Sequence, residues 1–162
     1  MHARTGRAIG KRYGVAYPEE FVAQLSGRFP GIYVEVKEDV WPRPKLYDVG
    51  PFWSFLYALH TFTPSPESED WMRLDIAAEQ FQEKTGIVAA PVLKIVGNPD
   101  MYCVDAEGKI VHYDHELNEV KPENRTFWEL FDWQVAELKD RKLRKLSGPV
   151  ENPRLRTCDI RR

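Results

Sequence analysis

One stretch of the chain, DMYCVDAEGKIVHYDHE (residues 100–116), gathers side chains that can do chemistry. It holds Cys103, His112, Asp114 and His115. A cysteine beside a histidine can form a nucleophile and its base, and histidines with an aspartate can ligate a transition metal. Whether either site exists depends on which face of the local structure each side chain occupies.

The segment D-A-E-G within this stretch predicts a β-hairpin. It suits a type I turn followed by a glycine in the left-handed conformation, whereas a two-residue turn would force a positive φ on a glutamate. The preferred turn sets Val104 opposite Ile110 and Cys103 opposite Val111. Cys103 and His112 then project to different faces, and only the less favoured register places them side by side. A Cys–His catalytic pair is therefore disfavoured.

Alternation along the second strand of the hairpin also separates the possible metal ligands. His112 and Asp114 should point to one face, and His115 to the other face with Tyr113. A catalytic zinc ion needs three protein ligands and an open position. We therefore expect no metal site and no cofactor, and a hydrolase or metal-dependent enzyme built on these residues stands third among the functional hypotheses.

Motifs of common enzyme classes are absent from the sequence. It contains no G-x-S-x-G elbow, no phosphate-binding loop, no dinucleotide fingerprint and no H-E-x-x-H. The acidic pairs Glu38/Asp39 and Glu69/Asp70 could do acid–base work, but such pairs are typical of solvated faces. We therefore expect a protein that is not an enzyme and has no catalytic residue.

Length and charge narrow the class of protein further. The chain has 162 residues, which suits a single domain with one core, and its 23 basic and 25 acidic residues leave a net charge of -2. This net charge creates no positive electrostatic field that would attract nucleic acid. No apolar run approaches the roughly 20 residues that span a bilayer, and the first residues lack the apolar part of a secretory signal. Cys103 and Cys158 are too few for a disulfide framework. We expect a cytoplasmic protein with reduced thiols that binds neither nucleic acid nor membrane.

Two helices are predicted toward the ends of the chain. In YPEEFVAQLSG, Pro18 suits a first helical position and Gly27 can close the C-terminus, which gives a helix over 18–26. In TFWELFDWQVAELKDRKLRKL, Thr126 and Glu129 have the spacing of a capping box. This long helix should dock on a sheet through one apolar stripe, which consists of Trp128, Phe131, Val135 and Leu138.

A middle helix is predicted from Ser65 to Gly86. Ser65 can cap it, Pro66 suits its first position, and Gly86 ends the pattern. Its apolar stripe consists of Trp71, Leu74, Ala78 and Phe81.

Two further segments have the pattern of strands. GIYVEVKEDVW alternates apolar and polar residues over 32–37 and predicts a half-buried strand, and GIVAAPVLKIVG predicts a largely buried strand over 91–96. The segment 41–66 is punctuated by prolines and apolar on every side in its middle, so that a strand and a buried helix both remain open.

The order of these pieces resembles the SUKH superfamily. YGVAYPEEFVAQLSG is similar to its entry helix, APVLKIVGNPDMYCVDAEGKIVHYDHE to its central segment with D-x-Y-x-x-D and a glycine turn, and TFWELFDWQVAEL to its closing helix. The aromatic and proline-rich insertion over 41–71 and the tail after 147 depart from the pattern. The matching residues, which in family terms are mainly structural, are Pro18, Glu19, Phe21, Asp100, Tyr102, Asp105 and Gly108.

This resemblance implies an α+β fold, with a mostly antiparallel sheet flanked by N-terminal and C-terminal helices. It places the domain at 13–146, with extensions over 1–12 and 147–162. Many bacterial members are immunity proteins that bind and neutralise a cognate toxin, often a nuclease, and the fungal relatives regulate cell-wall synthesis. No general catalytic motif is carried over.

The leading hypothesis is therefore a protein-binding module of the immunity type. Against a basic nuclease toxin, Glu35, Glu38 and Asp39 would complement the charge, and Trp41 would be the buried anchor. The alternative is a regulatory scaffold with several weaker protein partners.

Overall fold

A computed structural model describes residues 1–27, 30–35 and 58–146, with side chains described as far as residue 140. The helices of this part are α1 (His2–Tyr13), α2 (Glu19–Leu25), the short 3-10 helix η1 (Asp70–Met72), α3 (Leu74–Thr85) and α4 (Phe127–Leu146). The strands are β1 (Tyr33–Glu35), β2 (Ala58–Thr61), β3 (Ala89–Ile95), β4 (Met101–Asp105), β5 (Ile110–Asp114) and β6 (Glu119–Pro122).

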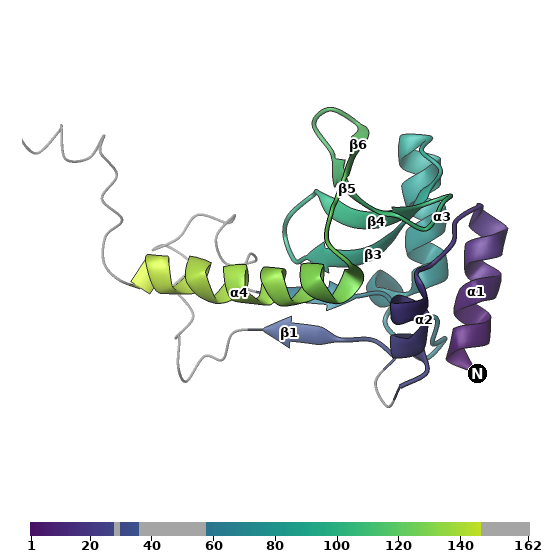
Figure 1. The fold of residues 1–162 in the computed structure, drawn as a ribbon, viewed down its shortest axis with the longest axis horizontal. Coiled ribbons are helices and arrows are strands. Elements are labelled where there is room, and N and C mark those ends of the chain that lie inside the picture. Colours follow the sequence, from purple (N-terminus) through teal and green to yellow (C-terminus); the bar gives the residue numbers. More distant parts are fainter. Residues whose placement is uncertain (28–29, 36–57, 147–162) are drawn as a thin grey trace, which may run out of the picture.

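The six described strands form one sheet in the order β1-β2-β3-β4-β5-β6, and every neighbouring pair is antiparallel. The chain thus builds the sheet as a meander, with β1 and β6 at its edges. Helices α1 and α3 lie side by side, whereas α4 runs along the sheet away from them (Figure 1). The expected α+β fold with an antiparallel sheet and flanking helices is confirmed. No helix in the described ranges has the length and apolar character that crossing a membrane requires.

The hairpin β4–β5 has the predicted turn and register. The amide of Gly108, whose φ is 82°, donates to the carbonyl of Asp105 at 3.2 Å. The carboxylate of Asp105 also accepts two turn amides at 2.9 Å, from Glu107 and Lys109. Cys103 pairs with Val111, as expected. Local turn chemistry was therefore sufficient to predict this part of the sheet.

The two faces of the sheet bury different apolar clusters. On one face, α2 and α4 contribute Phe21, Leu25 and Phe127 to the larger core. On the other face, Phe81 of α3 packs edge-on against a tyrosine of β5, Tyr113, with ring centroids 4.9 Å apart. Cys103 belongs to this second cluster and is fully buried. His112 lies on the opposite face beside Tyr102, so that the predicted separation of Cys103 from His112 is confirmed.

A β-bulge in β3 changes which side chains face α3. The partner of Pro91 is Cys103, but the partner of Leu93 is the adjacent Tyr102, so that Val92 is the extra residue. Val92 and Leu93 consequently both join the larger core. Lys94 therefore projects to the face that carries α3, although uninterrupted alternation from Pro91 would have directed it into the core.

Helix α3 begins at Leu74, and the prediction of a start at Ser65 was wrong. Thr63 and Arg73 form an isolated parallel bridge, in which the amide of Thr63 donates to Met72 and the amide of Leu74 donates to Thr63. This bridge closes residues 64–72 into a loop that ends in η1. Trp71 is therefore 53% exposed and does not belong to the buried stripe of α3.

The other predicted elements agree with the structure where it describes them. Helix α2, strand β1 and strand β3 lie within or beside the predicted ranges, and β2 shows that the end of the ambiguous segment is a strand. The residues 41–57 lie outside the described part. In α4 the capping box is present, because Thr126 N donates to Glu129 at 2.9 Å, and the stripe from Trp128 to Leu138 packs against the core.

Candidate functional site

The predicted partner-binding residues are only partly placed by the structure. Glu35 is an exposed residue of the edge strand β1. Glu38, Asp39 and Trp41 lie outside the described residues, so that the acidic patch around Trp41 stays a prediction.

The carboxylate of Asp100 joins the two histidines of the hairpin, which sequence alternation had separated. Its Oδ1 lies 2.6 Å from His115 Nδ1 and accepts the His115 amide at 3.0 Å, and its Oδ2 lies 3.4 Å from His112 Nε2. Burial alone would raise the pKa of Asp100, but the His115 bonds and the charge of the two histidines outweigh it and lower the pKa below its usual value.

The expectation that His115 and Asp114 do not converge was wrong. Ligand atoms of Asp100, Asp114 and His115 all lie within 4.8 Å of one another. The physical reason is that β5 ends at Asp114, so that His115 belongs to the following turn and escapes strand alternation. Three donors of this kind could ligate a cation.

The hydrogen bonds of this cluster give it a structural role in the turn between β5 and β6. Asp114 Oδ1 accepts the amides of Glu116 and Leu117 at 3.0 and 3.2 Å, and its Oδ2 pairs with Lys121 at 2.9 Å. These bonds are what a tight turn requires of an aspartate. The ammonium of Lys121 also supplies the positive charge that a cation would otherwise bring.

Cys103 offers no nucleophile. Burial raises the pKa of its thiol far above the usual value, so that the reactive thiolate is not formed at neutral pH.

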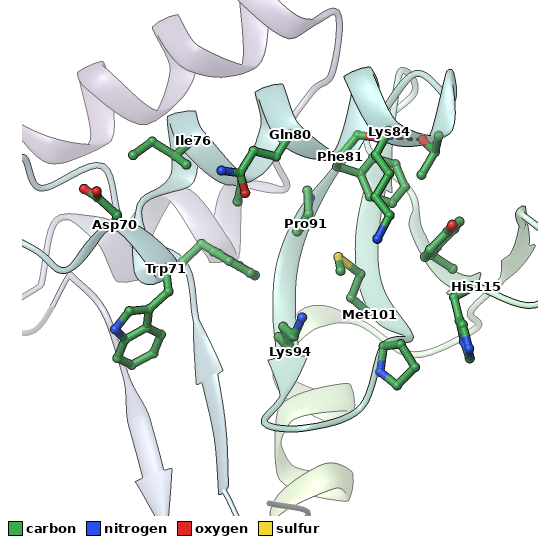
Figure 2. A pocket seen from close by; sticks show the side chains of 15 residues that line it. Asp70, Trp71, Ile76, Gln80, Phe81, Lys84, Pro91, Lys94, Met101 and His115 are labelled. Carbon is green, nitrogen blue, oxygen red and sulfur yellow. Dashed lines mark hydrogen bonds between the residues drawn. The ribbon is translucent and has the colours of Figure 1, made fainter.

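A concave surface lies on the face of the sheet that carries α3. A cavity of about 550 Å³ opens between α3 and strands β3 to β5, and we call it the α3 cavity (Figure 2). Its wall is mainly apolar, with Phe62, Phe81, Pro91 and Met101 among its members. Its polar side chains are those of Asp70, Gln80, Lys84, Thr85, Lys94 and His115.

A second hollow adjoins this cavity across the first three strands, and we call it the aromatic groove. Tyr33, His60 and Lys94 occupy one row of paired positions on β1, β2 and β3, and Trp71 closes the groove above them. The Trp71 ring is edge-on to both Tyr33, at 6.1 Å between centroids, and His60, at 4.9 Å. Trp71 and Lys94 line both hollows.

His60 is the buried floor of the aromatic groove, with 3% of its surface exposed. Burial lowers the pKa of its imidazole, and the nearby charge of Lys94 lowers it further, although a contact of Nδ1 with the carbonyl of Thr61 at 3.2 Å opposes this. The ring is therefore neutral at pH 7 and serves as an aromatic support for Trp71.

Lys94 is a partly buried cation for which the described residues supply no counter-ion. Its ammonium forms neither an ion pair nor a hydrogen bond with them, and the charge that acts on it is that of another lysine, Lys84. Burial lowers the pKa of Lys94, and Lys84 lowers it further.

Acidic residues lie in the two segments that carry Trp71 and Tyr33, and we call them the acidic rim. Glu67, Glu69 and Asp70 are all exposed in the loop that carries the tryptophan, and Glu35 lies on the same strand face as Tyr33. The side chain of Asp70 is 85% exposed and lies 3.8 Å from Arg73.

Trp71 and Lys94 were not predicted as residues that line a surface hollow. Trp71 fits the helical spacing of α3, and nothing in the local sequence reveals the bridge that removes it from that helix. A signal for Lys94 did exist, because it is the only charged residue in GIVAAPVLKIVG, a segment otherwise suited to burial.

Comparisons of the chain with protein-family models, with curated proteins and with solved structures found no match.

Proposed function

We propose that the chain is a non-catalytic protein-binding module of the immunity type, which acts in the cytoplasm by occluding a surface of a cognate toxin. The observation that carries the proposal is the pair of exposed rings at the edge of the sheet. Tyr33 is 46% exposed and Trp71 53% exposed, and the two rings touch edge-to-face. Exposed aromatic side chains that are already held in place are typical anchors of protein interfaces.

The charge around this pair favours a basic partner. Glu35, Glu67, Glu69 and Asp70 make up the acidic rim, and protein interfaces commonly combine an apolar centre with a charged edge. A nuclease toxin needs a basic surface to hold its substrate, so that an acidic rim complements it and speeds its capture. The resemblance to SUKH immunity proteins points to the same class of partner.

Strand β1 contributes residues to the same surface. Among the described strands it pairs with β2. Tyr33 and Glu35 project from this strand on the face of the aromatic groove.

The proposal is tested by purifying the full chain gently from its source cells and identifying companions by mass spectrometry. We expect one stoichiometric companion that carries a basic, toxin-like terminal domain. Several substoichiometric companions would support the regulatory scaffold instead.

Two tryptophan variants then test the surface. We expect Trp71→Ala to weaken the purified complex by about 2 kcal/mol or more, because it removes a central anchor. Trp133→Ala is the matched control, since Trp133 is 36% exposed but lies on α4, against Arg125. An unchanged affinity in a folded Trp71→Ala variant would exclude this surface.

A further inference from the structure

We propose that the α3 cavity binds a small amphipathic anion, with an apolar body and a carboxylate or phosphate head, and that Lys94 and Lys84 hold the head. This inference goes beyond the protein-binding function: the two surfaces share Trp71 and Lys94, but ligand binding is measured on the isolated chain.

The size and composition of the cavity suit a small molecule. A volume of about 550 Å³ falls within the range of pockets that bind small ligands. Its apolar wall, formed by Phe62, Ile76, Phe81, Pro91 and Met101, would take the body of the ligand. Such pockets typically combine an apolar lining with a few polar groups that orient the ligand.

Two ammonium groups supply the orienting charge. Lys84 approaches from the last turn of α3 and Lys94 from β3, and both point into the space between helix and sheet (Figure 2). Two like charges that face one space repel each other, and one anionic head placed between them would relieve this repulsion. Asp70 lies at the Trp71 end of the cavity, where its exposed carboxylate is near Arg73.

Of the two lysines, Lys94 gives the stronger evidence for an anionic ligand. A partly buried ammonium is ordinarily paired, because removing it from water is costly, yet the described residues offer it no partner. The bulge at Val92 directs this side chain to the cavity. Local rules are broken mainly where a function requires it, and a ligand carboxylate or phosphate would supply the missing counter-charge.

The test is calorimetric titration of the full chain with four probes that share an eight-carbon tail. Octanoate and octyl phosphate carry the proposed heads, 1-octanol is neutral and octylamine is cationic. We expect both anions to bind at least about tenfold more tightly than octanol or octylamine. The ranking of octanoate and octyl phosphate identifies the preferred head. Equal binding of octanol, or no binding of either anion at millimolar concentration, would overturn the proposal.

Three lysine variants complete the test. Lys94→Met, which keeps an unbranched side chain one atom shorter and removes the charge, and Lys84→Met should each weaken binding of the anions by about tenfold. Lys109→Met should leave it unchanged. Lys109 is the control because it lies in the β4–β5 turn, exposed and paired with Glu107.

Thermal unfolding of the same variants separates ligand binding from folding. Without ligand, Lys94→Met should melt at a higher temperature than the natural chain, because a partly buried cation has been removed. The stabilisation by octyl phosphate should be smaller than in the natural chain. A Lys94→Met variant that is folded and is stabilised by octyl phosphate as strongly as the natural chain would refute the role of Lys94.

Discussion

The ring of Trp71 stands edge-on against the ring of His60, with centroids 4.9 Å apart and planes at 81°. His60 in turn stands edge-on against Phe62, also at 4.9 Å. The exposed tryptophan is therefore the outermost member of a chain of rings that begins in the buried part of the sheet. Edge-to-face contacts of this kind restrict rotation of the outer ring, so that little side-chain entropy is lost when a partner binds it.

His60 should make the stability of the protein depend on pH. Burial holds the pKa of His60 in the folded protein below the ordinary histidine value of 6.5. As the pH falls below 6.5, the unfolded chain takes up a proton that the folded chain resists, so that the free energy of unfolding decreases. In His60→Phe this decrease should be smaller, which urea unfolding between pH 7 and about pH 5 can measure. Equal pH dependence in both proteins would contradict a neutral His60.

Asp100 should stabilise the folded protein at every pH at which its carboxyl group is ionised. Its folded pKa is lowered below 3.8, so that its contribution is fully present above that pH and disappears as the pH falls through the folded pKa. We expect Asp100→Asn to cost about 1 kcal/mol at neutral pH, because the bonds to the two histidines weaken. At acid pH, where the carboxyl is protonated, the difference should vanish. Asp132→Asn, on the exposed face of α4, should have little effect at either pH.

Two glycines allow backbone strain to be separated from steric conflict. Gly86 and Gly108 both have positive φ, at 73° and 82°. A Cβ at Gly86 would meet nothing within 4 Å, whereas a Cβ at Gly108 would lie 2.9 Å from the carbonyl oxygen of Ala16. Gly86→Ala should therefore cost about 1 kcal/mol, and Gly108→Ala should cost distinctly more. Denaturant unfolding of both variants measures the difference. Equal costs would show that the segment at Ala16 moves aside freely.

A glutamate of α2 caps a helix more than a hundred residues away in sequence. Glu20 Oε1 accepts the amide of Phe127, the first residue of α4, at 2.6 Å. We expect Glu20→Gln to cost about 1 kcal/mol, since a carboxylate at a helix N-terminus satisfies a free amide and favours the dipole. Glu19→Gln is the control, because Glu19 forms an exposed ion pair with Arg7 that should contribute little. Equal unfolding free energies of the two variants would contradict the long-range cap.

Local rules predicted those parts of the fold whose causes lie within a few residues. The Asp105–Gly108 turn and its register, the Thr126–Glu129 capping box and the helix after Pro18 all depend on hydrogen bonds or backbone angles between near neighbours. The separate burial of Cys103 followed from that register.

The features that local rules missed depend on distant parts of the chain. The groove position of Lys94 arises from a bulge opposite β4, and the exposure of Trp71 arises from the bridge between Thr63 and Arg73. Helix α1 was not predicted because its buried positions are glycines, Gly6 and Gly10, which no hydrophobic pattern reveals. A Cβ at Gly10 would lie 2.9 Å from the carbonyl of Val15, so that close backbone contact replaces side-chain burial there.

The meander order of the sheet has a consequence for how the chain folds. Each described strand pairs with its neighbours in sequence, and the turns after β4 and β5 span only a few residues, so that β4, β5 and β6 can join at little loop-closure entropy. Residues 36–57 separate β1 from β2, and residues 62–88 separate β2 from β3, so that both of these pairings must close longer loops. We therefore expect the β4–β6 end of the sheet to form early, and the aromatic groove, which needs β1, β2 and β3 together, to be completed last.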